Sequence, residues 1–149
     1  MTFYAHRGNL EGPQPKFEND PDYVQSAIDA GVGVEVDLRV ISGKLFLGHD
    51  YPAHMVSPEW LEERADQLLV HAKNLPAAVY LVGTTLHWFT HSQDAYSLTS
   101  SGKLWVHHLE AFRTENSSHY IIPLITRNLI DLSDKFGEAS ICSDYFQNA

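Results

Sequence analysis

Glu35 and Asp37 are the first residues whose types and spacing suggest chemistry, because two carboxylates lie two positions apart in an apolar segment. On a β-strand, residues at this spacing share a face. Two adjacent anions repel each other unless a cation lies between them. Carboxylate oxygens suit Mg²⁺ or Ca²⁺, and an added histidine makes Mn²⁺ or Zn²⁺ suitable. The pattern indicates either a divalent metal site or an exposed edge strand on which Arg39 pairs with the acids.

His6, Arg7 and Gly8 follow the first predicted strand, and His49 follows a later one. An arginine at such a position suits a bidentate grip on a phosphate, and a glycine lets a backbone approach closely. The alternative for the triplet is a turn that carries one surface cation. A lone histidine at the position of His49 is more often a hydrogen-bonding loop residue than a catalyst.

Short apolar segments alternate with helical patterns in the first half of the chain. The predicted strands there are 2–5, 32–41, 44–48 and 67–72, and the predicted helices are 22–30 and 59–66. After Pro76 the pattern loosens. The strands expected in this second half are 79–81, 86–90, 97–99, 104–107 and 139–143, with one helix at 123–136.

The order of these elements predicts parallel strands joined by crossover helices, which is an α/β fold. A full eight-fold β/α barrel needs about 250 residues, whereas this chain has 149. We therefore expect a reduced or irregular TIM-type β/α barrel. Its shortened second half would lack several crossover helices.

The composition is that of one globular domain, with 44% hydrophobic residues, so a single domain over 1–149 is predicted. No apolar run approaches the roughly 20 residues of a membrane-spanning helix, and the first residues do not resemble a signal peptide. One cysteine cannot form an internal disulfide. These features predict a soluble, cytoplasmic protein. The net charge of −9 disfavours nucleic acid as a partner.

The ordered set of motifs is more specific than its parts. It comprises His-Arg-Gly at 6–8, Glu18-Asn19, Glu-x-Asp at 35–37 and Gly-x-Leu-x-Leu-Gly-His-Asp at 43–50. Together these motifs resemble the amino-terminal signature of the glycerophosphodiester phosphodiesterases, which belong to the phospholipase-C-like barrel superfamily. The resemblance covers about a third of the chain.

The resemblance implies a metal-dependent phosphodiesterase of lipid metabolism that hydrolyses a small glycerophosphodiester. It implies acid–base roles for His6 and His49 and phosphate binding by Arg7, with Glu18 bracing the loop or the arginine. It also assigns a divalent cation to the Glu-x-Asp pair. In the family, a neighbouring substrate hydroxyl can attack phosphorus first, and water then opens the cyclic phosphate.

Two weaker similarities follow later in the chain. His71 and Lys73 stand where the family has Glu-x-Lys, so His71 is a candidate third metal ligand and Lys73 a candidate phosphate contact, the alternative for Lys73 being a surface lysine. A histidine ligand shifts the metal preference from Ca²⁺ towards softer ions. The segment 140–145 is similar to the closing strand of the family. It favours a chain that reaches its last barrel strand with material lost from the middle.

Aromatic residues and histidines are concentrated in segments 88–94 and 105–108. Aromatic and polar groups at strand ends suit an apolar substrate pocket, but Trp88, Phe89 and Trp105 equally suit the core. His91 and Asp94 are the best candidates here for a further substrate contact. We interpret His107, His108 and His119 as loop residues.

Other functions fit the same residues. One is a phospholipase-D-like lyase that cyclises a lysophospholipid. Enzymes of this type are generally secreted and disulfide-bonded, whereas this chain has a single cysteine, Cys142. Another is a catalytically degenerate phosphate-binding module. The presence of both His6 and His49 argues against it, because binding alone needs no acid–base pair. A structural or regulatory protein is a third. Because a thinned barrel exposes apolar edges, we also expect a homodimer that covers them.

Overall fold

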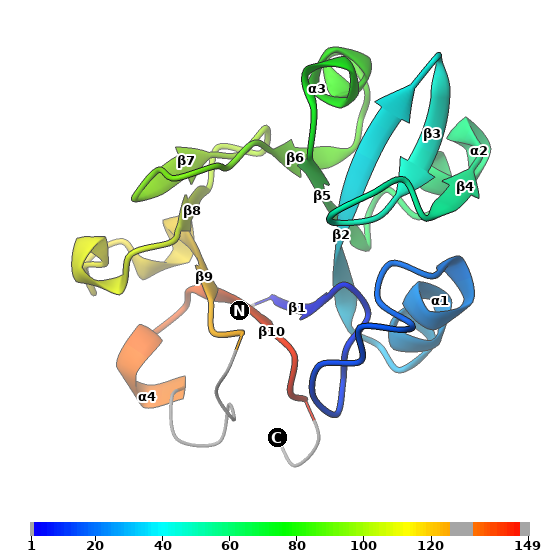
Figure 1. Ribbon diagram of the computed structural model, residues 1–149. Helices are drawn as coiled ribbons and strands as arrows, with labels where there is room; N and C mark the ends of the chain where they lie inside the picture. The colour runs from blue at the N-terminus through cyan, green and yellow to red at the C-terminus, as the bar shows by residue number, and fades with distance from the viewer. Residues whose placement is uncertain (1, 126–132, 147–149) are drawn as a thin grey trace.

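The computed structural model describes residues 2–125 and 133–146, which are built mainly from short strands that form one curled sheet (Figure 1). The strands are β1 Phe3–His6, β2 Gly33–Ile41, β3 Lys44–Leu47, β4 His54–Val56, β5 Leu68–Ala72, β6 His87–Phe89, β7 Tyr96–Leu98, β8 Leu104–Val106, β9 Tyr120–Pro123 and β10 Ser140–Ser143. The α-helices of this part are α1 Pro21–Asp29, α2 Pro58–Glu62, α3 Leu75–Leu81 and α4 Ser133–Phe136. Two 3₁₀ turns, η1 Leu109–Ala111 and η2 Ser117–His119, precede β9.

Strand β2 is the branch point of the sheet. Its first half pairs in parallel with β1 on one side and with β5 on the other, and β5 pairs with β6. Its second half forms an antiparallel hairpin with β3, which β4 extends. From β1 the sheet continues through β10, β9 and β8 to β7. The strand that carries Glu35 and Asp37 is therefore internal, which excludes the edge-strand interpretation of this acid pair.

The expected TIM-type β/α barrel is wrong. The sheet is a mixed, curled half-barrel, with antiparallel pairs at β2–β3, β3–β4 and β7–β8, and its helices are few and short (Figure 1). A β/α barrel needs a helix after each parallel strand. In the described residues between β6 and β9, the connections contain an antiparallel strand and two 3₁₀ turns instead. No described helix in this stretch therefore supplies an apolar face that could cover the sheet.

Two element predictions for the second half also fail. The strand expected at 79–81 is the end of helix α3, because Asn74 caps that helix by accepting a hydrogen bond from the Ala77 amide at 3.0 Å and a proline stands in its first turn. The helix expected at 123–136 begins with Pro123, which belongs to β9. Its residues 126–132 lie outside the described part, and α4 covers only its end.

Alternation along the strands gives the sheet two different faces. The face towards helices α1, α2 and α3 carries a core that includes Val34, Val36 and Leu38. Burial of each such side chain contributes about 1.5–3 kcal/mol. The other face is apolar around Phe89 and Trp105, and at β2 it becomes polar. In the described residues, no helix has the length and apolar character required to cross a membrane.

Candidate functional site

Glu35, Asp37 and His71 converge on two neighbouring strands. Parallel pairing of β2 with β5 places Asp37 beside His71. Because side chains alternate along a strand, Glu35 lies on the same face as Asp37. The Nδ1 atom of His71 lies 3.3 Å from Asp37 Oδ1 and 3.7 Å from Glu35 Oε1. One potential ligand atom from each residue lies within 4.8 Å of the other two. Three groups of ligating type therefore surround one small volume.

The donor set at this cluster fits a divalent cation. Glu35 and Asp37 are 2% and 0% exposed, and His71 is 8% exposed. Glu35 Oε2 and Asp37 Oδ1 are buried and have no hydrogen-bond partner among the described residues. Buried carboxylate oxygens without donors are costly. Two carboxylates and one imidazole would hold Mg²⁺, Ca²⁺, Mn²⁺ or Zn²⁺, and the imidazole favours the last two.

Opposite electrostatic environments surround the two carboxyl groups. Burial, together with the charge of Asp37, raises the pKa of Glu35. Burial alone would raise the pKa of Asp37 too, but its contacts with His71, Arg7 and Asn19 outweigh this effect and lower it. The surroundings therefore favour the ionised form of Asp37. They disfavour ionisation of Glu35, because its carboxylate would be a second buried negative charge next to the first.

Asn19 fixes the orientation of Asp37. Its side-chain amide nitrogen donates to Asp37 Oδ2 at 3.0 Å, and its side-chain oxygen accepts from the Asp37 main-chain amide at 2.9 Å. Asn19 is almost fully buried and has a left-handed backbone, with φ of 64°. Glu18-Asn19 is one of the motifs on which the family resemblance rests, but the sequence indicated no role for the asparagine. The structure shows that Asn19 holds a carboxylate of the cluster.

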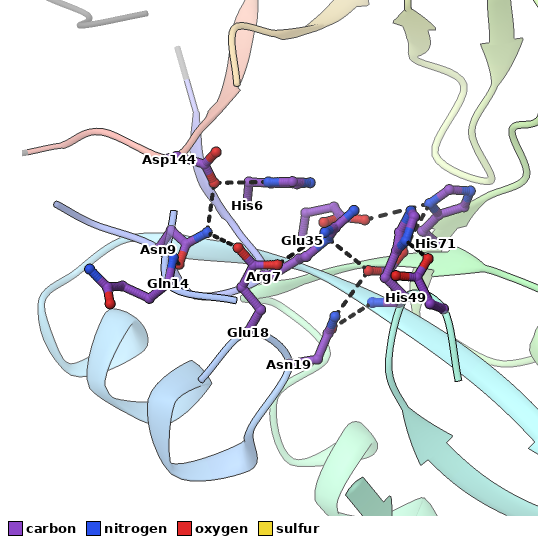
Figure 2. A network of polar contacts seen from close by, with 12 residues as sticks. His6, Arg7, Asn9, Gln14, Glu18, Asn19, Glu35, His49, His71 and Asp144 are labelled. Atoms are coloured by element: carbon purple, nitrogen blue, oxygen red, sulfur yellow. Dashed lines mark hydrogen bonds and ion pairs between the residues drawn. The ribbon is translucent and has the colours of Figure 1, made fainter. Parts of the chain in front are cut away.

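Arg7 lies between the cluster and the loop that follows β1 (Figure 2). Its Nε atom is 3.0 Å from Asp37 Oδ2, and its Nη1 atom donates to Glu18 Oε2 at 3.0 Å. The backbone of Arg7 is left-handed, with φ of 56°, a conformation that costs free energy in a non-glycine residue. Glu18 therefore braces Arg7, and two carboxylates hold the guanidinium in place.

His6 contacts a carboxylate from the opposite end of the described chain. Its Nδ1 atom lies 2.8 Å from Oδ1 of Asp144, directly after β10 (Figure 2). Asn9 donates to the same oxygen at 2.7 Å and to Glu18 Oε1 at 3.0 Å. Burial alone would lower the pKa of His6, but Asp144 and Glu35 outweigh it and the pKa is raised. The bond at Nδ1 leaves Nε2 as the atom that can exchange a proton with a ligand.

His49 lies in a loop that is held by main-chain contacts. Arg39 donates from Nε to the Gly48 carbonyl at 3.1 Å and from Nη2 to the His49 carbonyl. Gly48 has φ of 151°, and a Cβ atom there would lie 2.1 Å from the Tyr51 carbonyl oxygen. His49 Nδ1 lies 2.7 Å from Asp50 Oδ1. Arg39 thus positions the loop of His49 instead of pairing with the acids of β2.

A cavity of about 390 Å³ opens beside these groups. Both predicted catalytic histidines, His6 and His49, line it, together with Arg7. The residues that complete its lining are Pro13, Pro15, Lys16, Glu18, Asn19, Gly48, Asp50, Tyr51, Ala53, His54, Ile125 and Asp144. Because Arg7 and Asn19 touch both this cavity and Asp37, the cavity adjoins the cluster of Glu35, Asp37 and His71.

The remaining predicted site residues differ in their placement. Lys73 follows β5, and its Nζ atom lies 3.8 Å from Asp37 Oδ1, so it belongs to the cluster. His91 is not among the residues that line the cavity. Its main-chain carbonyl instead lies 3.3 Å from His71 Nε2, and its ring centroid lies 4.3 Å from that of His107. The structure thus gives His91 a contact with a candidate ligand.

Asp144 and Asn9 are site residues for which sequence reasoning assigned no role. The signal for Asp144 was its position after the last predicted strand. Parallel strands end at the same edge of a sheet, and β1 pairs in parallel with β10. This pairing brings Asp144 to His6, but the sequence alone did not show that these two strands are neighbours.

Comparisons of the chain with protein-family models, with curated proteins and with solved structures give no match.

Proposed function

We propose that this chain is a metal-dependent phosphodiesterase that hydrolyses a small phosphodiester, such as a glycerophosphodiester, in the cytoplasm. One observation carries the proposal: two histidines with carboxylate partners and an arginine line a single cavity that adjoins two buried carboxylates and a third histidine. The resemblance of the motifs in 4–50 to those of glycerophosphodiester phosphodiesterases points to the same chemistry.

Glu35, Asp37 and His71 would hold the divalent ion. When bound, the ion supplies positive charge that stabilises the phosphoryl oxygens and offsets the repulsion between the two carboxylates. Arg7 adds a fixed positive charge at the cavity wall. Glu18 and Asp37 orient the guanidinium, so little conformational entropy is lost when it binds a phosphate oxygen.

His6 and His49 would transfer the protons. Each has Nδ1 next to an aspartate, at 2.8 Å and 2.7 Å respectively, which leaves Nε2 for the substrate. One imidazole removes a proton from the attacking hydroxyl group or water, and the other donates a proton to the oxygen that leaves phosphorus. A new P–O bond forms as the ester P–O bond breaks. The products are one phosphomonoester, or a cyclic phosphate, and one alcohol.

The test uses glycerophosphocholine and lysophosphatidylcholine as separate substrates, each with Mg²⁺, Ca²⁺, Mn²⁺ or Zn²⁺. Phosphorus NMR identifies the products, because glycerol phosphate and a cyclic phosphate have different chemical shifts. We expect metal-dependent release of a phosphomonoester from glycerophosphocholine. Accumulation of a cyclic phosphate that water does not open would favour the lyase. Absence of product with either substrate and all four metals would contradict the proposal.

A further inference from the structure

The ring of His71 is fixed by a stack of aromatic side chains. The ring centroids of His71 and Phe89 are 4.6 Å apart, with 14° between the planes. Phe89 in turn stacks on Trp105 at 4.5 Å and 20°. Phe89 is 1% exposed and Trp105 is 4% exposed, so this stack lies inside the molecule. The plane of the His71 imidazole is consequently defined before any ligand binds.

A main-chain carbonyl defines which nitrogen of His71 carries the proton. The Nε2 atom lies 3.3 Å from the carbonyl oxygen of His91. A carbonyl oxygen only accepts hydrogen bonds, so Nε2 must be the donor. In the neutral imidazole the lone pair is then on Nδ1. Metal-binding histidines generally use this arrangement, in which a hydrogen bond at one nitrogen fixes the other as the ligand.

The Nδ1 atom faces the two carboxylates. It lies 3.3 Å from Asp37 Oδ1 and 3.7 Å from Glu35 Oε1. Two anionic oxygens so close to this nitrogen require a positive charge. A proton on Nδ1 supplies it in the absence of an ion, and a bound metal ion replaces that proton, so that Nδ1 becomes a ligand. Asp37 Oδ1 makes no hydrogen bond among the described residues, and the Lys73 ammonium, 3.8 Å away, is beyond hydrogen-bond distance, so this oxygen keeps its lone pairs for a cation.

We infer that His71 binds the metal ion of the proposed phosphodiesterase through Nδ1, and that Phe89 and the His91 carbonyl position its ring for this purpose. This inference rests on the proposed function for the presence of the ion. One nitrogen and two carboxylate ligands make the site selective for Mn²⁺, Co²⁺ or Zn²⁺ over Mg²⁺ and Ca²⁺. Phe89 and His91 are positioning residues that act through His71.

The direct test is NMR of the ¹⁵N-labelled full chain with ¹¹³Cd²⁺, a spin-active substitute for Zn²⁺. Long-range ¹H–¹⁵N spectra resolve both imidazole nitrogens, and the signals missing in His71→Gln identify His71. We expect ¹¹³Cd–¹⁵N coupling at Nδ1 and a protonated Nε2. Coupling at Nε2, or coupling only to other histidines such as His107, would overturn the inference.

A second test measures Zn²⁺ and Ca²⁺ affinities by calorimetry. We expect Phe89→Leu to weaken Zn²⁺ binding by about 10- to 100-fold, as the loss of a group that orients a ligand does. Phe112→Leu, which removes a ring from a separate cluster with Tyr120 and Phe136, is the matched control and should leave Zn²⁺ affinity unchanged. His71→Glu should reverse the preference in favour of Ca²⁺. If His71→Glu kept the Zn²⁺ preference of the wild type, His71 would not be the selective ligand.

Failure of this inference differs from failure of the proposed function. Coupling at Nδ1 without phosphodiester turnover would leave the ligand assignment intact and contradict the enzyme. Turnover with coupling at Nε2, or without a contribution from His71, would support the enzyme and contradict the ligand assignment. Should Phe89→Leu fail to fold, the NMR spectrum of the wild-type chain still decides the ligand atom.

Discussion

His6 and Asp144 are separated by 138 positions in the chain, yet His6 Nδ1 lies 2.8 Å from Asp144 Oδ1. Parallel pairing of β1 with β10 produces this contact, because both residues lie at the ends of these strands. The carboxylate is 2% exposed. This buried carboxylate therefore orients the imidazole at the wall of the cavity, which both residues line.

We expect Asp144→Asn to lower phosphodiester turnover by about 10²-fold, because the amide lacks the negative charge that stabilises the protonated imidazole and can donate to Nδ1, which favours the wrong tautomer. Turnover of glycerophosphocholine measures the effect. Asp50→Asn is the matched control, since it removes an exposed carboxylate from His49 and should have a smaller effect. Wild-type turnover in Asp144→Asn would show that this contact has no catalytic role.

Asn19→Gly tests the support of Asp37. The glycine tolerates the left-handed backbone but removes both hydrogen bonds to Asp37. We expect the free energy of unfolding to fall by about 1–3 kcal/mol, because a buried amide and carboxylate lose their partners. Urea unfolding in EDTA provides the value.

Ser42→Gly is the control for this experiment, because Ser42 also has a positive φ but is exposed. It should leave the stability unchanged or raise it slightly, since the strain is relieved and no buried bond is lost. Equal effects of the two substitutions would mean that the hydrogen bonds of Asn19 do not stabilise the fold.

Arg39→Met tests the loop of His49. The substitution removes the donors to the Gly48 and His49 carbonyls, so the imidazole loses its fixed position. We expect turnover to fall by about tenfold or more while Zn²⁺ affinity stays unchanged, because misplacing a reacting group is costly and the side chain of Arg39, within the described residues, bonds the Gly48 and His49 carbonyls and not Glu35, Asp37 or His71. Arg113→Met, at an exposed arginine, is the control. A parallel loss of Zn²⁺ affinity would show that Arg39 acts on the cluster itself.

Cys142 provides a prediction on pH. It is fully buried, and burial raises the pKa of its thiol well above the ordinary value. Below about pH 8.5 the thiol is protonated in both the folded and the unfolded chain. Above that pH the unfolded chain loses the proton first, so the stability that the buried thiol contributes is lost as pH rises.

The measurement compares urea unfolding of wild type and Cys142→Ala at pH 7.5 and pH 9.5. Other groups titrate equally in both proteins. We expect the free energy of unfolding to fall more steeply with pH in wild type than in the variant. Identical slopes would mean that the thiol is ionised as easily in the folded chain as in the unfolded one.

Local patterns predicted the positions of most strands and helices in the first half, but not strand β4. The alternation in 32–41 correctly placed Glu35 and Asp37 on one face, and the apolar positions between them on the other. In the second half, the strands expected at 86–90, 97–99, 104–107 and 139–143 correspond to β6, β7, β8 and β10. The strand expected at 79–81 and the helix expected from 123 were wrong there, because these elements are too short to carry a clear period. Asn74 shows the difficulty: its role as a helix cap was overlooked, and a strand was expected where α3 ends.

The residues of the candidate site were recognisable wherever a motif contained them. What the sequence did not contain was the strand order. Asp144 reaches His6 only because β10 lies next to β1, and Arg39 points to the His49 loop only because β3 turns back on β2. Both contacts depend on long-range pairing, which a local pattern does not encode.

The cluster of Glu35, Asp37 and His71 is the most direct point at which to test the proposed metal-dependent chemistry. Hydrolysis of bis-p-nitrophenyl phosphate should be measured while Mn²⁺ is added to metal-free wild type, Glu35→Gln and His6→Ala. We predict saturable, Mn²⁺-dependent turnover in wild type, a much higher Mn²⁺ requirement in Glu35→Gln, and turnover lowered by about 10²- to 10⁴-fold at unchanged Mn²⁺ affinity in His6→Ala. Turnover that is independent of Mn²⁺, or equal in all three proteins, would contradict the account.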